Sequence, residues 1–308
     1  MAIFDVDNEL NEQDVPISNL SNDNMVDSEG SMDIPKAEDD NVYGLSEAEK
    51  SDPTLIQTVI SDKKTPIVVL FGPPACGKTM LMIRIARYLK QLGYEVKPKG
   101  DFRPQYDSNY ESICNNFNTL LNSNFAAEST NRISFMLLEV LDEHKNRVCQ
   151  ILEAPGEHYH NPNNLGKGFL PYIENIINSP NRKIWAIMAE LNWNKNVTDY
   201  IDRIAELRKS IEKKDSILFI CNKVDLTPFV RGKCDVNIKQ LKQDFCDEYI
   251  GLFNMFTYRT LFGKKHAYKF VPFQTGSYTR SGSGRVVFSQ GDDYYPKMLW
   301  NTIRSFGI

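Results

Sequence analysis

The chain has 308 residues, enough to bury a sizeable core in one large domain or two small ones. Its composition, 41% hydrophobic and 25% charged, is ordinary for a globular protein. The net charge is -4, and the basic residues are too dispersed to favour nucleic-acid binding, which requires a clustered basic patch.

The first fifty residues differ in charge from the rest of the chain. They contain fourteen Asp and Glu against Lys36 and Lys50, whereas the remainder carries 34 basic and 26 acidic residues. An acidic segment with few aromatic residues cannot bury enough apolar surface to offset its ordering entropy. We therefore predict a disordered acidic tail over residues 1–52 and one domain over residues 53–308. Two roles are open for the tail: a solubilising segment, or an arm that binds a partner or inhibits the mildly basic domain.

Cysteine usage and the chain ends bear on the cellular location. The six cysteines form no C-x-x-C pair, and several lie in apolar runs, which favours reduced buried thiols. The start MAIFDVDNEL lacks the basic region and apolar core of a signal peptide, and no apolar run is long enough to span a bilayer. Lipidation motifs are absent from both ends. We therefore expect a cytoplasmic protein without a membrane anchor.

From residue 54 the chain alternates short apolar runs with amphipathic stretches, which is typical of an α/β sheet. Residues 67–71 are all apolar, as expected of a strand buried on both faces. In chain order we then predict a helix over 80–91, a long functional loop over 93–131, hairpin strands over 133–140 and 147–152, a helix over 169–178, a strand over 184–191, a helix over 198–213, a strand over 216–221, a mainly helical segment over 226–266, a strand over 267–273 and a helix over 296–305.

A glycine-rich motif of the form G-x-x-x-x-G-K-[ST] follows the first predicted strand and opens the first predicted helix. Backbone amides of such a P-loop turn inward around phosphate oxygens, and the helix N-terminus adds its dipole. Lys78 is expected to reach the β and γ phosphates, and the Thr79 hydroxyl to bind magnesium. The predicted phosphate-binding residues are Gly72, Pro73, Pro74, Ala75, Cys76, Gly77, Lys78, Thr79 and Met80.

A second motif, Asn222-Lys223-Val224-Asp225, follows the predicted strand at 216–221 and indicates which base is bound. A carboxylate at Asp225 can accept hydrogen bonds from the N1–H and the 2-amino group of guanine. Adenine lacks that amino group and presents an acceptor at N1, so buried polar groups would be left unpaired. We expect Asn222 to brace the loop and the stem of Lys223 to lie over the ring. The two motifs together predict a site for GTP or GDP with Mg²⁺.

With these motifs in this order, residues 65–305 resemble the P-loop GTPase superfamily, and the predicted hairpin strands resemble its Ras-like and translation-factor class. The resemblance implies an α/β three-layer sandwich with a mostly parallel six-stranded sheet and one antiparallel strand. It also implies a molecular switch that alternates between GTP-bound and GDP-bound shapes. Unidentified protein effectors or activators are the partners that such a switch implies.

The resemblance assigns roles to the segment after residue 152. Glu153-Ala-Pro-Gly156 stands where the family has D-x-x-G: the family's Asp holds magnesium through a water, and its Gly amide contacts the γ phosphate. Glu153 is one methylene longer than Asp, so its metal contact is either displaced or direct. Glu157 and His158 occupy the positions where relatives orient the attacking water.

Two further assignments rest on the resemblance. Thr130 is the best positional match for the switch threonine that binds magnesium, and Thr119 is its rival. Thr275, Gly276 and Ser277 follow a predicted strand where the family has a loop that contacts the guanine O6 atom. No arginine stands where it could act in cis on the phosphates, and such a residue is worth roughly 10³ to 10⁵ in rate, so we expect slow intrinsic hydrolysis.

Three functions stay open from the sequence. The first is a GTP hydrolase that acts as a switch, with Lys78, Thr130, Glu157 and His158 as catalytic residues. The second is a nucleotide-loaded scaffold with little or no hydrolysis, favoured by Glu at 153 and by the absence of Gln at 157. The third is an ATP-dependent P-loop kinase, in which the match at 222–225 would be a coincidence.

Overall fold

The computed structural model describes residues 44–122, 135–160, 168–191, 197–230, 236–260, 263–280 and 286–308. Residues 1–43 of the tail predicted over 1–52, and the predicted switch threonine, Thr130, lie outside these residues. Within them no helix combines the length and the apolar character that a bilayer crossing requires.

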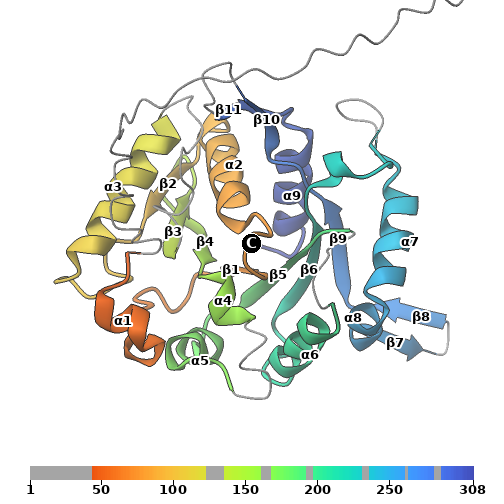
Figure 1. Cartoon of the computed structure of the whole chain (residues 1–308), viewed down its shortest axis with the longest axis horizontal. Helices are drawn as coiled ribbons and strands as arrows, with labels where there is room; N and C mark the ends of the chain where they lie inside the picture. The colour runs from red at the N-terminus through yellow and green to blue at the C-terminus, as the bar shows by residue number, and fades with distance from the viewer. Residues whose placement is uncertain are drawn as a thin grey trace, which may run out of the picture. The chain divides into compact units, whose positions relative to one another are not determined.

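The centre of the molecule is a sheet of seven described strands in the order β2-β3-β4-β1-β5-β6-β9. β3 runs antiparallel to both of its neighbours, and the remaining pairs are parallel. Helices cover both faces, with α2, α3 and α9 on one side and α5 and α6 on the other (Figure 1). The strands are β1 (Ile67–Phe71), β2 (Glu95–Pro98), β3 (Met136–Leu141), β4 (Arg147–Glu153), β5 (Lys183–Ala189), β6 (Ser216–Cys221) and β9 (Tyr268–Pro272).

The α/β class and the one antiparallel strand are confirmed, whereas the predicted count of six strands is wrong. The additional strand is β2 at the sheet edge, and it pairs with β3 in register Val96↔Val140. It is followed by a fifteen-residue helix, α3 (Ser108–Asn122), so residues 93–131 are not one long loop. Tyr110, Ile113 and Phe117 of α3 are buried at helical spacing. Five Asn residues within the helix weaken its intrinsic helical preference, which explains why composition alone did not reveal it.

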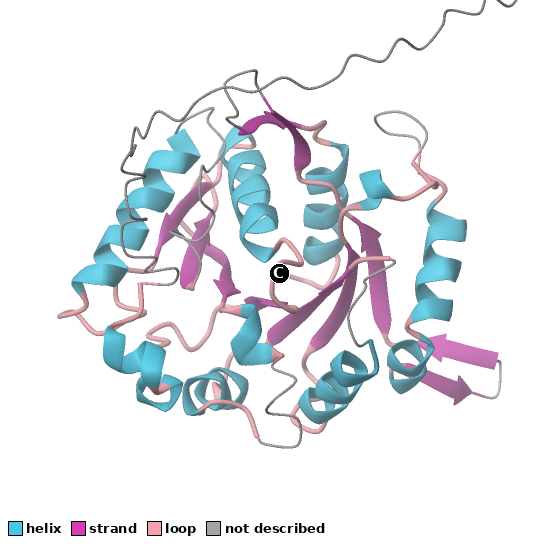
Figure 2. Ribbon diagram, in the orientation of Figure 1, coloured by secondary structure: helices cyan, strands magenta, loops and turns pink. Residues whose placement is uncertain are grey.

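The helices predicted in the rest of the chain are found with shifted ends, and the ribbon in Figure 2 shows where helix and strand alternate. The segment 226–266 is predicted to be mainly helical, yet β7 (Thr257–Thr260) and β8 (Gly263–His266) pair within it as antiparallel strands. A second unpredicted hairpin consists of β10 (Gly276–Arg280) and β11 (Val286–Gln290). Besides α3, the described helices are α1 (Glu47–Ser51), α2 (Lys78–Gln91), α4 (Gly156–Tyr159), α5 (Pro171–Asn178), α6 (Val197–Arg208), α7 (Ile238–Glu248), α8 (Ile250–Met255) and α9 (Tyr294–Arg304), with the short 3-10 turns η1 (Pro53–Leu55) and η4 (Val224–Leu226).

Ordered structure begins before residue 53, where the domain was predicted to start. Helix α1 (Glu47–Ser51) opens with a capping box in which Ser46 and Glu49 satisfy each other's backbone amides. Leu45 is buried in the core, and Glu49 forms an ion pair with the buried Arg103 at 2.6 Å. Residues 44–52 therefore belong to the folded domain rather than to a tail.

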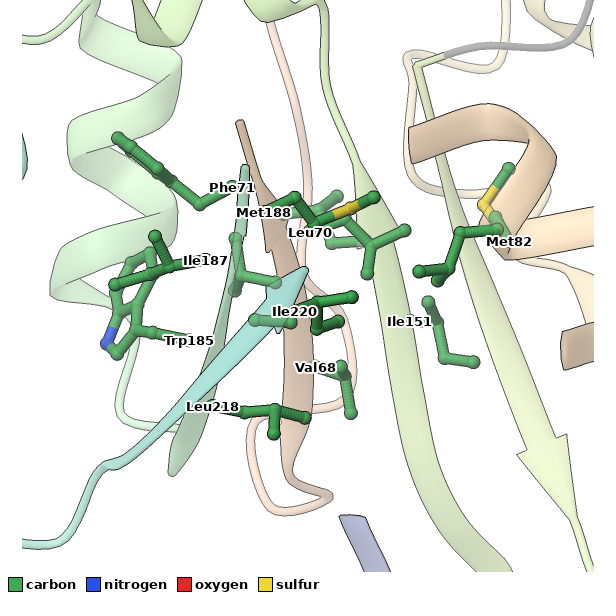
Figure 3. Packing of buried hydrophobic residues seen from close by; sticks show 14 of the residues in the cluster. Val68, Leu70, Phe71, Met82, Ile151, Trp185, Ile187, Met188, Leu218 and Ile220 are labelled. Atoms are coloured by element: carbon green, nitrogen blue, oxygen red, sulfur yellow. The ribbon is translucent and has the colours of Figure 1, made fainter. Parts of the chain in front are cut away.

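The core lies on both faces of the central strands. All five residues of β1 are buried, as the apolar run predicted. Figure 3 shows Leu70 and Met188 on the face toward Met82 of α2, and Phe71 with Trp185 on the opposite face. Because β1 is buried on both faces, the loop that follows it is held on a rigid strand at the centre of the sheet.

A candidate nucleotide site at the end of the central strands

The P-loop connects the end of β1 to the first turn of α2. Its backbone takes left-handed conformations at Ala75 (φ +61°) and at Gly77 (φ +89°), the residue that caps α2. A Cβ atom at Gly77 would lie 2.4 Å from Nδ2 of Asn222, so both the backbone angle and the close approach require glycine there. The loop therefore has the tight turn that lets amides point at a phosphate.

Lys78 is buried at the base of this loop, with only 6% of its surface exposed. Its Nζ atom donates to the carbonyl oxygens of Gly72 at 3.0 Å and Pro73 at 2.9 Å. These bonds hold the ammonium group against the loop interior. An ammonium group fixed in this position can attract phosphate oxygens at short range.

Thr79 and Glu153 meet beside Lys78. The Thr79 hydroxyl donates to Oε1 of Glu153, the last residue of β4. Glu153 is 2% exposed, and its Oε2 atom has no hydrogen-bond partner among the described residues. Burial raises the pKa of this carboxyl to about 7, against the opposing effects of Lys78 and the Thr79 hydrogen bond. A hydroxyl and a carboxylate are hard oxygen donors, so the pair fits magnesium.

Gly156 lies directly against the P-loop. A Cβ atom on it would be 2.4 Å from the Pro74 amide nitrogen, 2.5 Å from the Pro73 carbonyl carbon and 2.7 Å from Nζ of Lys78. The structure thus brings residue 156 to the P-loop, and its contact with a γ phosphate stays a prediction. Only a residue without a side chain can approach the loop so closely.

Glu157 and His158 follow on the short helix α4. Nδ1 of His158 is 2.9 Å from the hydroxyl of Tyr172 on α5, and the two rings are in edge contact. Burial lowers the pKa of His158 to about 4, so the ring is neutral at pH 7. Glu157 is partly exposed next to it. His158 is therefore held by α5, although it lies only two residues from Gly156.

The loop over residues 222–225 lies against the P-loop. Nδ2 of Asn222 donates to the Cys76 carbonyl at 2.7 Å, and Nζ of Lys223 donates to the Ala75 carbonyl at 3.1 Å. Asn222 is 2% exposed, whereas Asp225 in η4 is exposed. The structure thus joins two motifs that are almost 150 residues apart in the chain. Bracing of the nucleotide loop by Asn222 stays a prediction, for which this contact supplies a geometry.

The segment containing Thr275, Gly276 and Ser277 starts beside the same loop. Phe273 donates its amide to Cys221 O at 2.7 Å and accepts from the Val224 amide at 3.3 Å. Thr275 follows two residues later, and Gly276 and Ser277 are the first residues of β10. The predicted O6-contacting loop therefore lies at the base of a hairpin, an extension that no sequence signal indicated.

Two predicted elements of the site are not brought to it in the described residues. Thr130, the preferred switch threonine, lies outside those residues. The rival threonine, Thr119, is exposed on α3, and its hydroxyl donates to the Asn115 carbonyl of its own helix at 3.0 Å. It makes no recorded contact with Thr79 or Glu153.

One residue of the site was missed from the sequence. Glu190, directly after β5, forms an ion pair with Nζ of Lys223 at 2.7 Å. Its own carbonyl oxygen accepts from the Tyr249 hydroxyl at 2.8 Å. A single Glu at a strand end carries no recognisable spacing, so only the fold reveals that it contacts Lys223.

The described residues hold no other cluster suited to metal. No group of three or more His, Cys, Asp or Glu side chains is placed around a common point in the described part of the chain. Cys76, Cys114, Cys149, Cys221 and Cys246 are free thiols, as expected, and Cys234 lies outside the described residues. A divalent cation at Thr79 and Glu153 would thus depend on further oxygens from a nucleotide.

Comparison with known proteins assigns no residue of the site. No protein-family model matches the chain. No curated protein matches it. Among solved structures the chain is similar to a nucleolar GTP-binding protein 1 from Plasmodium falciparum, with 13% identity, a TM-score of 0.38, and coverage of 81% of this chain and 89% of that one. A likeness this weak supports no residue assignment.

Proposed function

We propose that the chain binds GTP and GDP with Mg²⁺ and hydrolyses GTP slowly as a molecular switch. The observation that carries the proposal is the attachment of residues 222–223 to the P-loop, through Asn222 and Cys76 at 2.7 Å and through Lys223 and Ala75 at 3.1 Å. A loop that reads the base is useful only at a fixed distance from a loop that binds the phosphates. These two hydrogen bonds fix that distance.

Guanine selectivity follows from Asp225 in this proposal. Asp225 is exposed, so its carboxylate can accept hydrogen bonds from the N1–H and 2-amino groups of guanine. With adenine, the carboxylate would face a ring nitrogen that only accepts hydrogen bonds. An unpaired polar group of this kind costs about 1–3 kcal/mol, enough to favour guanine strongly.

For the chemistry we propose in-line attack of water on the γ phosphate. Lys78 and the P-loop amides stabilise the charge that develops on the phosphate oxygens. Thr79 and Glu153 would hold Mg²⁺, which would neutralise charge on the phosphate oxygens. Glu157, or neutral His158 once it leaves Tyr172, orients the water. The buried Arg84 is occupied by Gly291 O, Asp292 O and Asp293, so it supplies no charge to the phosphates.

The test is competition for fluorescent GDP on the purified full-length chain with Mg²⁺. Unlabelled GTP and GDP are expected to displace the probe, and ATP is not. Asp225→Asn should shift the preference from guanine to xanthine nucleotides, and Lys78→Ala should abolish tight binding. Displacement by ATP, or an unchanged base preference in the Asp225 variant, contradicts the proposal and favours a phosphotransfer enzyme.

A second function is favoured by one contact. The 2.9 Å contact between His158 and Tyr172 keeps a water-orienting side chain on α5. If that contact persists with GTP bound, the chain is a nucleotide-loaded scaffold that signals by binding alone. Turnover measured with and without cell extract separates the two functions. A rate that rises with extract supports a switch with a protein activator, and no turnover under either condition supports the scaffold.

A further inference from the structure

The side chains of Thr79 and Glu153 come from different elements and meet beside the P-loop. Thr79 is the second residue of α2, and Glu153 ends β4, whose neighbour in the sheet is the strand that leads into the P-loop. The register Leu70↔Glu153 places the carboxylate at the level where β1 ends. The Thr79 hydroxyl donates to one carboxylate oxygen of Glu153 without any bridging group.

The second oxygen of the same carboxylate is available to bind a ligand. Oε2 of Glu153 is buried and has no hydrogen-bond partner in the described part of the chain. The nearest cation, Lys78, directs its Nζ atom to the carbonyls of Gly72 and Pro73. Burying a carboxylate oxygen without a partner costs free energy unless a ligand or an ion binds that oxygen. A divalent cation bound next to the Thr79 hydroxyl would do so.

We infer that Glu153 binds the divalent cation directly, through a carboxylate oxygen, next to the hydroxyl of Thr79. The inference rests on the proposed nucleotide function and specifies its metal site. In octahedral Mg²⁺ coordination at about 2.1 Å, neighbouring ligand oxygens lie roughly 3 Å apart. Two oxygens already in direct contact need only a small separation to become neighbouring ligands. A carboxylate that acts through a metal-bound water could also accept from the Thr79 hydroxyl, but it would leave one more water on the ion than direct binding does.

Direct binding has a consequence for the cation. Thr79 and Glu153 supply two protein ligands that are present whether the nucleotide carries two phosphates or three. The cation should therefore stay bound in the GDP complex. Without a cation, Thr79 and Glu153 form a hydrogen bond with each other instead of binding the ion. Binding of the cation exchanges that hydrogen bond for two metal bonds.

The experiment uses Mn²⁺, which prefers the same oxygen ligands as Mg²⁺ and is paramagnetic. The full chain is loaded with GDP and Mn²⁺ in ¹⁷O-enriched water, and the metal-bound waters are counted by electron–nuclear double resonance. The shorter side chain of Glu153→Asp should bind the ion only through a water. The number of metal-bound waters in this variant is therefore expected to exceed the wild-type number by one. Its Mn²⁺ affinity should fall by at least roughly tenfold. Glu139→Asp shortens a buried carboxylate on the next strand, β3, and should change neither value.

A second measurement needs only the wild-type protein, in case the Glu153 variant does not fold. Glutamate labelled with ¹³C at the side-chain carboxyl gives a resolved coupling to Mn²⁺ when a carboxylate is bound directly, and none when a water intervenes. A coupling supports the inference. Its absence, or equal water counts in wild type and Glu153→Asp, overturns the inference while nucleotide binding stands. Failure of the chain to bind GDP at all would instead overturn the proposed function.

Discussion

At the scale of single residues, Gly156 stands where the structure leaves no room for a side chain. Its α carbon faces the backbone of Pro73 and Pro74 and the ammonium group of Lys78, all within 2.7 Å of the place of a Cβ atom. A γ phosphate entering beside Lys78 must come close to the same residue. If the proposed function holds, residue 156 would therefore respond to the third phosphate.

Gly156→Ala should therefore impair triphosphate binding more than diphosphate binding. The added methyl group forces residue 156 away from the P-loop, which removes its amide from the γ phosphate. We expect the affinity for a non-hydrolysable GTP analogue to fall by roughly tenfold relative to that for GDP, equivalent to about 1.4 kcal/mol. Gly100→Ala is the matched control, because a Cβ atom there meets nothing within 4 Å. Equal losses for both nucleotides would contradict the role of Gly156.

His158 is the second residue with a distinct expected behaviour. Burial lowers its pKa to about 4 in the folded chain, below the ordinary value of 6.5. The unfolded chain therefore binds more protons between pH 4 and 6.5, and folding stability is lost as the pH falls through that window. The contribution is fully present above pH 6.5 and amounts to about 3 kcal/mol at most.

His158→Gln should flatten this part of the pH profile. Urea denaturation at a series of pH values from 4 to 7 measures it, as the difference in unfolding free energy between wild type and variant. The exposed His144 supplies the control: His144→Gln should leave the profile of the wild type unchanged. A wild-type slope that persists in His158→Gln would assign the acid sensitivity to other groups.

At the scale of elements, local motifs were predictable and contacts between distant elements were not. The P-loop is one continuous run between a strand and a helix, so its spacing sufficed to place Lys78 and Thr79. The contact of Asn222 with Cys76 was expected only in outline, because it depends on how β1 and β6 lie in the sheet. The contact between His158 and Tyr172 depends on the position of α5, and no sequence pattern predicts it.

The missed secondary structure has the same physical origin. β2 is four residues long and half polar. Its pairing with β3, and not an apolar pattern in its sequence, makes it a strand. The hairpins β7–β8 and β10–β11 likewise depend on cross-strand hydrogen bonds. Strand preference is weak and depends on neighbours, whereas a buried central strand such as β1 identifies itself by five apolar residues.

The connection between β5, β6 and the P-loop supplies a prediction at this scale. Glu190 pairs with Lys223, which in turn donates to Ala75. Glu190→Gln removes the negative charge that holds Lys223 in place. We expect GDP affinity to fall a few-fold, because a partly exposed ion pair contributes about 1 kcal/mol or less. Dissociation of fluorescent GDP should accelerate by the same factor.

The control for that variant is Glu212→Gln, which removes an ion pair with Lys214 on the exposed turn before β6. It should leave the rate of GDP dissociation unchanged. If Glu190→Gln also leaves the rate unchanged, the ion pair has no part in holding the base loop, and the hydrogen bond of Asn222 alone braces it.

At the scale of the whole molecule, each end of the described chain is attached to the rest of the domain through a buried arginine, Arg84 or Arg103. Arg84 of α2 donates to the segment before α9, at 2.8 Å to Gly291 O and 2.7 Å to Asp293. At the other end, α1 is attached through Glu49 and Arg103. The last helix and the first helix are therefore integral to the fold rather than appended to it.

Truncation tests where the domain begins. A chain starting at residue 44 keeps α1, its capping box and the buried Leu45, and should unfold at nearly the same temperature as the full chain. A chain starting at residue 53 loses the burial of Leu45, which is 4% exposed, and leaves Arg103, 3% exposed, with Asp107 alone. Loss of one buried leucine and of a partner for a buried cation costs about 3 kcal/mol or more. Such a loss lowers the unfolding temperature by roughly 5 °C or more in a domain of this size.

Calorimetry of the three chains, each with and without GDP and Mg²⁺, measures both effects. The chain from residue 44 should also bind GDP as the full chain does, because the P-loop and the base loop are intact. Equal unfolding temperatures for the chains from residues 44 and 53 would show that α1 contributes nothing to the domain. A chain from residue 44 that is much less stable than the full chain would instead give the acidic segment a structural role, which its composition argues against.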